Sequence, residues 1–355
     1  MNNASLGMPP RSVVEAVARG YEAISREPLH GKHDLQERIA ERVLPGLANL
    51  FGSNADELSL TRNATEALHL QTVGLALEPG DEVLITTQEH PAGYRPWMFR
   101  QERHGIVVNE VFVPSPLPGG DEVVELLAAA MTPKTKAISF CHVTRGGHRY
   151  PVKKIASMAR DRGVRTLVDG AQAVGQFPID VHELGCDAYS ASLHKWVLAP
   201  AGTGFLYVRE QARDDIRTAF APGATRATPE LAPPGTADFP IRAAISAALD
   251  FNEALGTARI EERCRYLSAY LKAGLARIDG VRLLSGSTHE TSAPGSTIFE
   301  KDGLDAVASV GMMEERSQTH LDEHKRDGHN AIRISTHVYN TTAEIDRLLD
   351  ALDSA

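Results

Sequence analysis

The 355-residue sequence predicts an α/β fold, in which a mainly parallel central sheet is followed by a smaller C-terminal α+β domain. Short apolar runs typical of buried strands alternate with segments of helical periodicity, a pattern that favours a parallel sheet covered on both faces. The chain is also longer than the size at which a single core usually stops growing, which indicates two domains. From about Gly256 onward the pattern changes to an amphipathic helix, short strands and a closing helix.

Each expected element follows from a local pattern. Strands are expected at residues 82–86, 137–140, 165–168, 188–191 and 204–208, and helices at 63–77, 152–162, 241–255 and 342–352. The first helix ends before Glu78-Pro79-Gly80, and Gly163 provides the break before the strand at 165–168. Residues 221–240 are rich in Pro, Gly, Thr and Ala, which predicts a long loop. We therefore expect a large domain at residues 15–250 and a small domain formed by residues 1–14 and 251–355.

Composition excludes several classes of function. The chain is 42% hydrophobic and 23% charged with a net charge of −9, and it has no basic block to bind a nucleic acid. No apolar run reaches the roughly 18 residues that a membrane span needs, and no secretory leader follows Met1. The three cysteines, Cys141, Cys186 and Cys264, are widely spaced and odd in number, which argues against a disulfide framework. A cytoplasmic protein is expected.

Two residues at predicted strand ends carry the main chemical signal. Asp169 ends one apolar strand, with Gln172 a short turn beyond, and Lys195 follows another strand about two dozen residues later. An acid and a desolvated lysine at neighbouring strand ends suit pyridoxal phosphate (PLP), whose pyridine nitrogen needs a carboxylate and whose aldehyde needs an amine. A buried Asp–Lys ion pair without a cofactor explains these two residues equally well.

Two further segments suggest cofactor contacts. Thr65 lies at the start of a predicted helix, where free backbone N–H groups and a hydroxyl can bind a phosphate, although a plain N-cap is the simpler interpretation. His90 follows the strand at 82–86 and is placed to stack on a cofactor ring, although a histidine there is more often only a hydrogen-bonded polar residue.

Five segments together resemble the class V aminotransferase-fold enzymes, PLP-dependent transferases of fold type I. They are Asn63-Ala64-Thr65, Glu89-His90, Asp169-Gly170-Ala171-Gln172, Ser192-Leu193-His194-Lys195 and Arg333-Ile334-Ser335, in the order and spacing of the family. The family includes cysteine desulfurases, kynureninases and isopenicillin-N epimerase-like proteins. The resemblance covers nearly the whole chain.

The resemblance implies a role for each matching residue. Lys195 is expected to hold PLP as a Schiff base and to move the Cα proton, while Asp169 pairs with the pyridine nitrogen. Gln172 is expected to bind the ring oxygen, and His90 to stack on the ring. The residues expected to bind the phosphate are Ala64, Thr65, Ser192 and His194.

Three more residues are implied at the edges of the site. Arg333 is expected to bind the α-carboxylate of an amino-acid substrate, a task that suits a guanidinium. Asn3 lies in a segment that resembles the family's N-terminal pocket segment. Thr236, after Gly235, is expected to reach the phosphate of a neighbouring subunit, which implies a homodimer with shared active sites.

Two departures from the family pattern narrow the set of reactions that the chain is expected to catalyse. Residues 312–330 lack the cysteine that a desulfurase needs before its carboxylate-binding arginine, so a desulfurase is disfavoured. Ala237 stands where epimerase-like chains often have arginine, and Arg226 or Arg242 are candidates to replace it. We expect isopenicillin-N epimerase-like or C–S/β-elimination lyase-like chemistry at the Cα of an amino acid, with a class V aminotransferase as the alternative.

Other classes are weaker. His320, Glu323 and His324 fit the H-x-x-E-H pattern of inverted zinc peptidases, which requires two histidines one helical turn apart. The charged, His-rich stretch 314–329 lacks the apolar residues that would bury a helix, so a solvated and mobile charged segment is the simpler interpretation. No metal site is expected. A non-catalytic scaffold protein is disfavoured because Lys195, Asp169 and Arg333 are all present.

Overall fold

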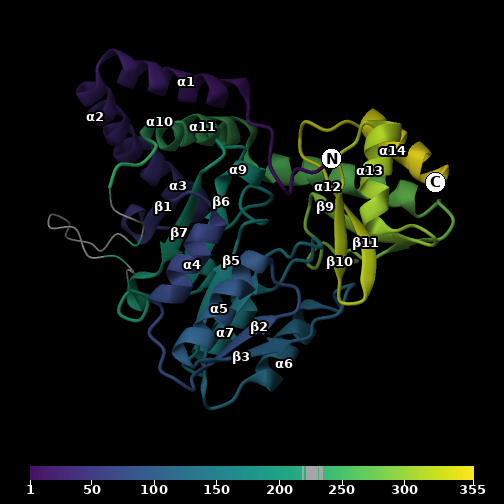
Figure 1. The fold of residues 1–355 in the computed structure, drawn as a ribbon, viewed down its shortest axis with the longest axis horizontal. Helices are drawn as coiled ribbons and strands as arrows, with labels where there is room; N and C mark the ends of the chain where they lie inside the picture. Colours follow the sequence, from purple (N-terminus) through teal and green to yellow (C-terminus); the bar gives the residue numbers. More distant parts are fainter. Residues whose placement is uncertain (218–219, 221–230, 232–234) are drawn as a thin grey trace.

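The computed structural model describes residues 1–217, 220, 231 and 235–355 (Figure 1). Arg226 and most of the loop predicted at 221–240 therefore lie outside the described residues. The described elements form two sheets, a large one in the first two thirds of the chain and a small one near the C-terminus. The predicted α/β fold with a smaller C-terminal α+β part is confirmed.

The large sheet has seven strands and is mostly parallel. In spatial order they are β1 (Leu58–Thr61), β7 (Gly204–Val208), β6 (Ala188–Ser192), β5 (Arg165–Asp169), β4 (Thr135–Cys141), β2 (Glu82–Thr86) and β3 (Val107–Val111). Strands β3, β2, β4, β5 and β6 run parallel, whereas β7 is antiparallel to both of its neighbours. The carboxyl ends of β5 and β6 therefore meet at one edge of the sheet, where Asp169 and Ser192 end their strands.

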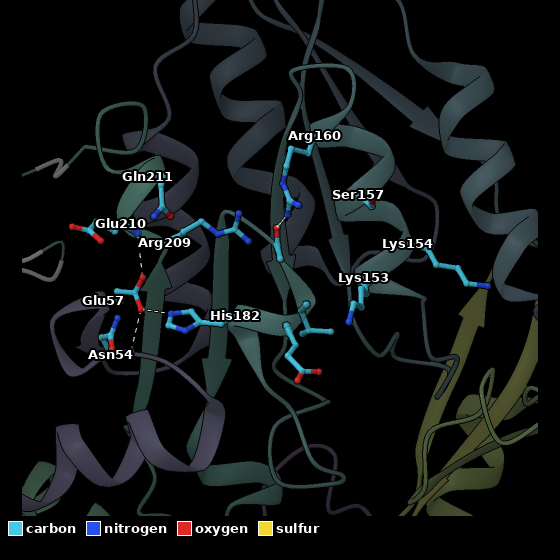
Figure 2. Close-up of a pocket in the computed structure, with 13 residues that line it drawn as sticks. Asn54, Glu57, Lys153, Lys154, Ser157, Arg160, His182, Arg209, Glu210 and Gln211 are labelled. Atoms are coloured by element: carbon cyan, nitrogen blue, oxygen red, sulfur yellow. Dashed lines mark hydrogen bonds and ion pairs between the residues drawn. The ribbon is translucent and has the colours of Figure 1, made fainter.

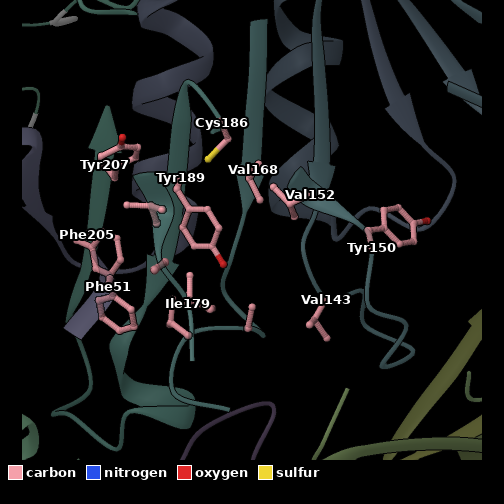
Figure 3. Close-up of a cluster of buried hydrophobic side chains, with 14 of the residues drawn as sticks. Phe51, Val143, Tyr150, Val152, Val168, Ile179, Cys186, Tyr189, Phe205 and Tyr207 are labelled. Carbon is pink, nitrogen blue, oxygen red and sulfur yellow. The ribbon is translucent and has the colours of Figure 1, made fainter. Parts of the chain in front are cut away.

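Helices cover both faces of this sheet. They are α1 (Arg11–Arg26), α2 (Pro28–Arg38), a π-helical turn (Ile39–Val43), α3 (Leu44–Phe51), α4 (Ala64–Gly74), α5 (Pro91–His104), α6 (Gly120–Ala130), α7 (Val152–Arg160), α8 (Val181–Leu184), α9 (Leu193–Trp196), α10 (Phe239–Ala243) and α11 (Ile245–Leu255), with short 3₁₀ turns at Ala55–Glu57 and Glu210–Ala212. Successive strand residues alternate between two hydrophobic clusters: Val168 and Tyr207 belong to one, Leu167 and Leu206 to the other. Figure 3 shows part of the first cluster, with Tyr189 beside Val168. Because both faces are buried, these strands are continuous apolar runs in the sequence.

The small sheet is antiparallel and lies beside the large one (Figure 1). Its strands, in spatial order, are β10 (Asp322–Arg326), β11 (His329–Ser335), β9 (Ser296–Lys301) and β8 (Val281–Leu283), and its helices are α12 (Thr257–Leu275), α13 (Ala306–Ser317) and α14 (Thr342–Asp353). Met1 packs against the hydrophobic cluster of this part, and Asn2 forms a parallel bridge with Ser335. The domain limits at residues 14/15 and 250/251 remain a proposal.

Two expectations about secondary structure were wrong. The helix expected at 241–255 is two helices, because the chain turns at Ala244 between α10 and α11. The stretch 314–329 is not a solvated charged segment: it forms the end of α13, β10 and the start of β11, with His324 only 3% exposed. Residues 322–324 of the H-x-x-E-H pattern are in an extended strand, so His320 and His324 are not one helical turn apart. Among the described helices, none is long and apolar enough to cross a bilayer.

Candidate functional site

A pocket at the carboxyl ends of β5 and β6 brings together most of the predicted site residues. Its cavity has a volume of about 40 Å³. Its lining residues are Ala64, Thr65, Leu68, His90, Ala92, Cys141, Val143, Arg145, Asp169, Ala171, Gln172, Ser192 and Lys195. Seven of these thirteen were predicted from the sequence, and they come from four separate segments of the chain. Pockets at strand ends of open α/β sheets are where this kind of fold binds ligands.

Four predicted residues lie outside this lining. Thr236 is exposed, and His194 forms a hydrogen bond through Nδ1 with the Thr203 carbonyl, 3.1 Å away. Asn3 is buried, and its side chain accepts a hydrogen bond from the Tyr339 hydroxyl at 2.6 Å. Arg333 is also buried, in β11 of the small sheet.

Lys195 and Asp169 come from the ends of adjacent parallel strands. Asp169 ends β5, and its Oδ1 accepts a hydrogen bond from the Ala171 N–H at 2.8 Å. Lys195 lies in α9, the short helix that follows β6 directly. Burial raises the pKa of Asp169 and lowers that of Lys195, while the charge of each opposes the shift of the other. The pocket therefore holds an acid and an amine that are both shifted toward their neutral forms.

The N-terminal segment fixes the backbone of α9. The Gly7 N–H donates to the His194 carbonyl at 2.9 Å, and Asn3 Nδ2 donates to the Lys195 carbonyl at 3.3 Å. A Cβ on Gly7 would lie 2.0 Å from the Lys195 carbonyl oxygen, so only glycine allows this approach. Asn3 thus acts on the backbone of the lysine helix.

The first turn of α4 faces the pocket with backbone N–H groups. Asn63, and not Thr65, is the N-cap, because its side chain accepts a hydrogen bond from the Glu66 N–H at 2.9 Å. The Ala64 N–H donates to Ser192 Oγ at 2.9 Å, which ties this turn to the end of β6. Within the described part of the chain, the Thr65 N–H has no hydrogen-bond partner. A free N–H, a hydroxyl and a helix N-terminus make this corner suitable for an anion.

His90 caps α5 and lines the same pocket. Its Nδ1 accepts a hydrogen bond from the Ala92 N–H at 3.1 Å. Desolvation, and then the charges of Lys195, Arg145, Arg326 and Arg333, lower the pKa of His90 to about 4. The imidazole is therefore neutral at physiological pH, as a ring that stacks on another ring would be.

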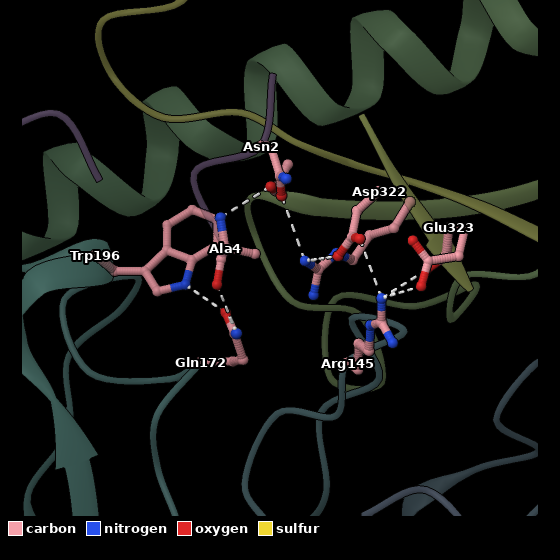
Figure 4. A network of polar contacts seen from close by, with 9 residues as sticks. Asn2, Ala4, Arg145, Gln172, Trp196, Asp322 and Glu323 are labelled. Atoms are coloured by element: carbon pink, nitrogen blue, oxygen red, sulfur yellow. Dashed lines mark hydrogen bonds and ion pairs between the residues drawn. The ribbon is translucent and has the colours of Figure 1, made fainter. Parts of the chain in front are cut away.

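Gln172 is held by two groups (Figure 4). Its Nε2 donates to the Ala4 carbonyl and its Oε1 accepts from Trp196 Nε1, both at 2.9 Å. The predicted contact with a cofactor oxygen would have to share this amide with the N-terminal segment.

Two charged residues that the sequence did not reveal border the site. Arg145, after β4, lines the pocket, and its Nη2 lies 3.1 Å from Asp322 Oδ1 and from Glu323 Oε1 (Figure 4). Asp322 also forms an ion pair with Arg333. Burial lowers the pKa of Arg333 to about 10, and the Asp322 charge opposes that shift. Arg145 lies five residues beyond the strand expected at 137–140, which is a weak positional signal, but its pairing with Asp322 could not be predicted from the sequence.

Glu89 is a buried carboxyl group next to the pocket. It accepts a hydrogen bond from Thr86 Oγ1 at 2.6 Å and from the Cys141 thiol at 3.0 Å. Burial raises the pKa of Glu89 to about 7, and the nearby Asp169 charge adds to this shift.

We expect Glu89→Gln to remove part of the pH dependence of stability. The folded-state pKa is raised, so stability from this group is complete below the unfolded value of 4.5 and declines until the pH passes about 7. That decline corresponds to about 3 kcal/mol in the free energy of unfolding. Urea unfolding at about pH 5 and about pH 8 measures it. An undiminished decline in the variant would show that another group causes it.

A larger open groove lies elsewhere on the molecule (Figure 2). It is about 700 Å³ and is lined by residues of α7, α8 and the segments next to β1 and β7. Some of its lining groups are paired with one another: Glu57 bonds His182 at 2.5 Å, and Arg160 bonds the Gly185 carbonyl. None of the predicted site residues lines this groove.

Comparison with known proteins gives one family. The family profile described as "Aminotransferase class-V" matches residues 1–348. Isopenicillin N epimerase of Amycolatopsis lactamdurans is 31% identical over 99% of this chain and 94% of its own length. A probable cysteine desulfurase of Synechocystis is 29% identical over 100% of this chain and 90% of its own.

Solved structures agree with the sequence comparison. A C-DES mutant with glycine covalently linked to its PLP cofactor is similar with a TM-score of 0.91, at 25% identity, over 99% of this chain and 95% of that one. The cystine C–S lyase C-DES in complex with its product cysteine persulfide has a TM-score of 0.90 at 25% identity, over 99% of this chain and 96% of that one.

Proposed function

The chain belongs to the aminotransferase class-V family, and from this premise we propose that it binds PLP through Lys195 and acts at the Cα of an amino acid. The observation that carries the proposal is the placement of Asp169 and Lys195 at the ends of adjacent parallel strands, in one pocket. The similarity to a C-DES structure with a PLP-linked ligand supports it.

The residues of the pocket fit the parts of this cofactor. Asp169 would face the ring nitrogen, and the neutral His90 ring would lie against the cofactor ring. The first turn of α4, with Ala64, Thr65 and the Ser192 hydroxyl, would hold the phosphate, with His194 beside it. Bound PLP would supply an electron sink that makes the Cα proton of an amino acid removable.

The chain's own residues would then bind the substrate and move a proton. Because burial lowers its pKa, the Lys195 amine is more readily neutral than an exposed lysine, so its Nζ can accept and return a proton. Arg333 would hold the α-carboxylate, which fixes the Cα–H bond toward that amine.

The reaction type is proposed as epimerase-like or C–S/β-elimination lyase-like, with an aminotransferase as the alternative. The sequence similarity to isopenicillin N epimerase supports the first, and the structural similarity to a cystine C–S lyase supports the second. A desulfurase is less favoured, because all three cysteines are buried and burial raises the pKa of each thiol.

Incubating the enzyme with a panel of L- and D-amino acids in heavy water tests this proposal. Deuterium at Cα without a keto acid indicates epimerisation, pyruvate or ammonia release indicates elimination, and keto acid with pyridoxamine phosphate indicates transamination. We expect one of the first two outcomes. If every amino acid of a broad panel is recovered without deuterium at Cα and without loss of substrate, the proposal of chemistry at Cα is contradicted.

We also propose a homodimer in which Thr236 completes the phosphate site of the partner subunit. Thr236 is exposed and lies outside the pocket of its own chain, as this role requires. Loss of one hydroxyl contact with a charged phosphate is expected to weaken PLP binding about tenfold in Thr236→Ala. Titrating the apoprotein with PLP measures this, and Thr257→Ala, at the start of α12, is the control. Unchanged affinity, or full activity as a monomer, would contradict the shared site.

A further inference from the structure

On one edge of the Arg333 guanidinium, the Nη2 group has hydrogen-bond partners but the Nε group has none among the described residues. The side chain is 4% exposed; its Nη2 forms an ion pair with Asp322 Oδ2 and a 3.3 Å hydrogen bond with Asn2 Oδ1. Its Nε is buried and has no hydrogen-bond partner among the described residues. A carboxylate binds most strongly to a guanidinium when it accepts from two N–H groups at once. The unpartnered Nε therefore indicates that a second acceptor belongs on this edge.

Asp322 connects this arginine with the pocket. One of its oxygens pairs with Arg333, and the other lies 3.1 Å from Arg145 Nη2. Figure 4 shows Arg145 beside Asp322 and Glu323, joined by dashed lines to both carboxylates. Arg145 lines the pocket, whereas Arg333 is buried and is not among the lining residues. Asp322 is therefore a carboxylate that already contacts both arginines, one of which lines the pocket.

The charges of this cluster balance without any ligand. Arg145 and Arg333 carry two positive charges, and Asp322 and Glu323 carry two negative ones. A substrate carboxylate brings a further negative charge, so it has to compete with Asp322 for Arg333. If Asp322 moves off Arg333, Arg145 still neutralises it, because that contact already exists.

We propose that Asp322 is an internal competitor for the carboxylate position of Arg333, and that a substrate's carboxylate binds by shifting Asp322 onto Arg145 alone. The proposal rests on the proposed function, in which Arg333 binds the α-carboxylate. Asp322 thereby determines specificity: it weakens the binding of every carboxylate and favours substrates with additional contacts elsewhere in the pocket. It also keeps the buried Arg333 neutralised between turnovers.

Asp322→Asn tests this in the holoenzyme with two carbonyl reagents that share an aminooxy group on one carbon. Aminooxyacetate carries a carboxylate and O-methylhydroxylamine does not, and both react with a lysine-bound PLP, which changes its visible absorbance. The ratio of their apparent affinities isolates carboxylate recognition. We expect the variant to raise this ratio about tenfold, the contribution of one charged hydrogen bond.

Glu323→Gln is the matched control, because Glu323 contacts Arg145 and not Arg333. Its ratio is expected to stay within about twofold of the wild-type value. A ratio that is unchanged or lower in Asp322→Asn would overturn the proposal, because Asp322 would then only hold Arg333 in position.

A second readout does not depend on the cofactor. Acetate, compared with chloride, should raise the thermal unfolding temperature of Asp322→Asn as purified by more than it raises that of the wild type, since the variant leaves Arg333 without its acid. Equal shifts in both proteins overturn the proposal. If neither carbonyl reagent reacts with the wild type, the PLP assignment fails, and the acetate comparison alone decides the role of Asp322.

Discussion

Replacing Lys195 by alanine is expected to abolish covalent PLP binding and to reduce turnover by at least about 10³-fold, since a positioned base and a covalent anchor are lost together. The visible absorbance of the wild-type protein would disappear with the lysine. The fold should persist, because the desolvation that lowers the pKa of Lys195 shows that its charge does not favour the folded state. Absorbance spectra, a turnover assay and thermal unfolding of the variant measure the three effects.

Lys272 provides the matched control. Burial also lowers the pKa of this lysine, to about 8, but its Nζ bonds Ser292 Oγ in a pocket beside α12. Lys272→Ala should keep the absorbance and the turnover of the wild type. If Lys195→Ala retained the absorbance while Lys272→Ala lost it, Lys272 and not Lys195 would hold the cofactor, and the proposal would be wrong.

The buried strands of the large sheet were predictable because both of their faces are covered. Strands β2 and β7 have the expected bounds, since a short apolar run bounded by turn residues is typical of a buried strand. Strand β3, at Val107–Val111, was not predicted. It lies at the edge of the sheet, and polar and half-exposed residues interrupt its apolar pattern. Helices α1 and α2 were missed for a similar reason, because they bury few residues.

The β10–β11 hairpin shows what a sequence pattern cannot convey. Its charged residues suggested exposure to solvent, but in the structure some pair with the segment that follows β2: Arg326 donates to the Glu89 carbonyl, and Gln88 Nε2 donates to Asp327 Oδ2 at 2.8 Å. Such partners are more than 200 residues apart in the sequence, at separations of 237 and 239. Charge pattern alone contains no information about which partners the fold will supply.

For the same reason, some residues of the candidate site were predicted from the sequence and others were not. Asp169, Ser192 and Lys195 were found because each follows a predictable strand, and parallel strands bring their carboxyl ends to one edge. Arg145 and Asp322 were not found, because their meaning depends on a contact between the two sheets. Strand ends can be predicted from local pattern, whereas contacts between separately folded parts cannot.

Asp169→Asn is expected to lower turnover about 10²- to 10³-fold, because the variant lacks the fixed negative charge for the cofactor's ring nitrogen. Its effect on stability should have the opposite direction. Burial raises the pKa of Asp169, so at neutral pH the ionised carboxylate costs folding free energy, and a neutral amide does not. The asparagine oxygen can still accept from the Ala171 N–H. Urea unfolding without added PLP should therefore show equal or greater stability.

Asp187→Asn is the control, because Asp187 directly precedes β6, at the amino end of the strand. This variant should lose stability and keep turnover. Asp187 is 8% exposed, accepts a hydrogen bond from the Thr166 N–H at 2.8 Å and pairs with Arg165 at 3.0 Å. Its replacement should cost about 1–3 kcal/mol of stability while leaving the absorbance and turnover per folded molecule intact. A cofactor-binding acid is expected to affect turnover when it is replaced, whereas an acid of a structural ion pair is expected to affect the free energy of unfolding. The two variants distinguish these roles. Equal loss of stability in both variants would identify Asp169 as structural.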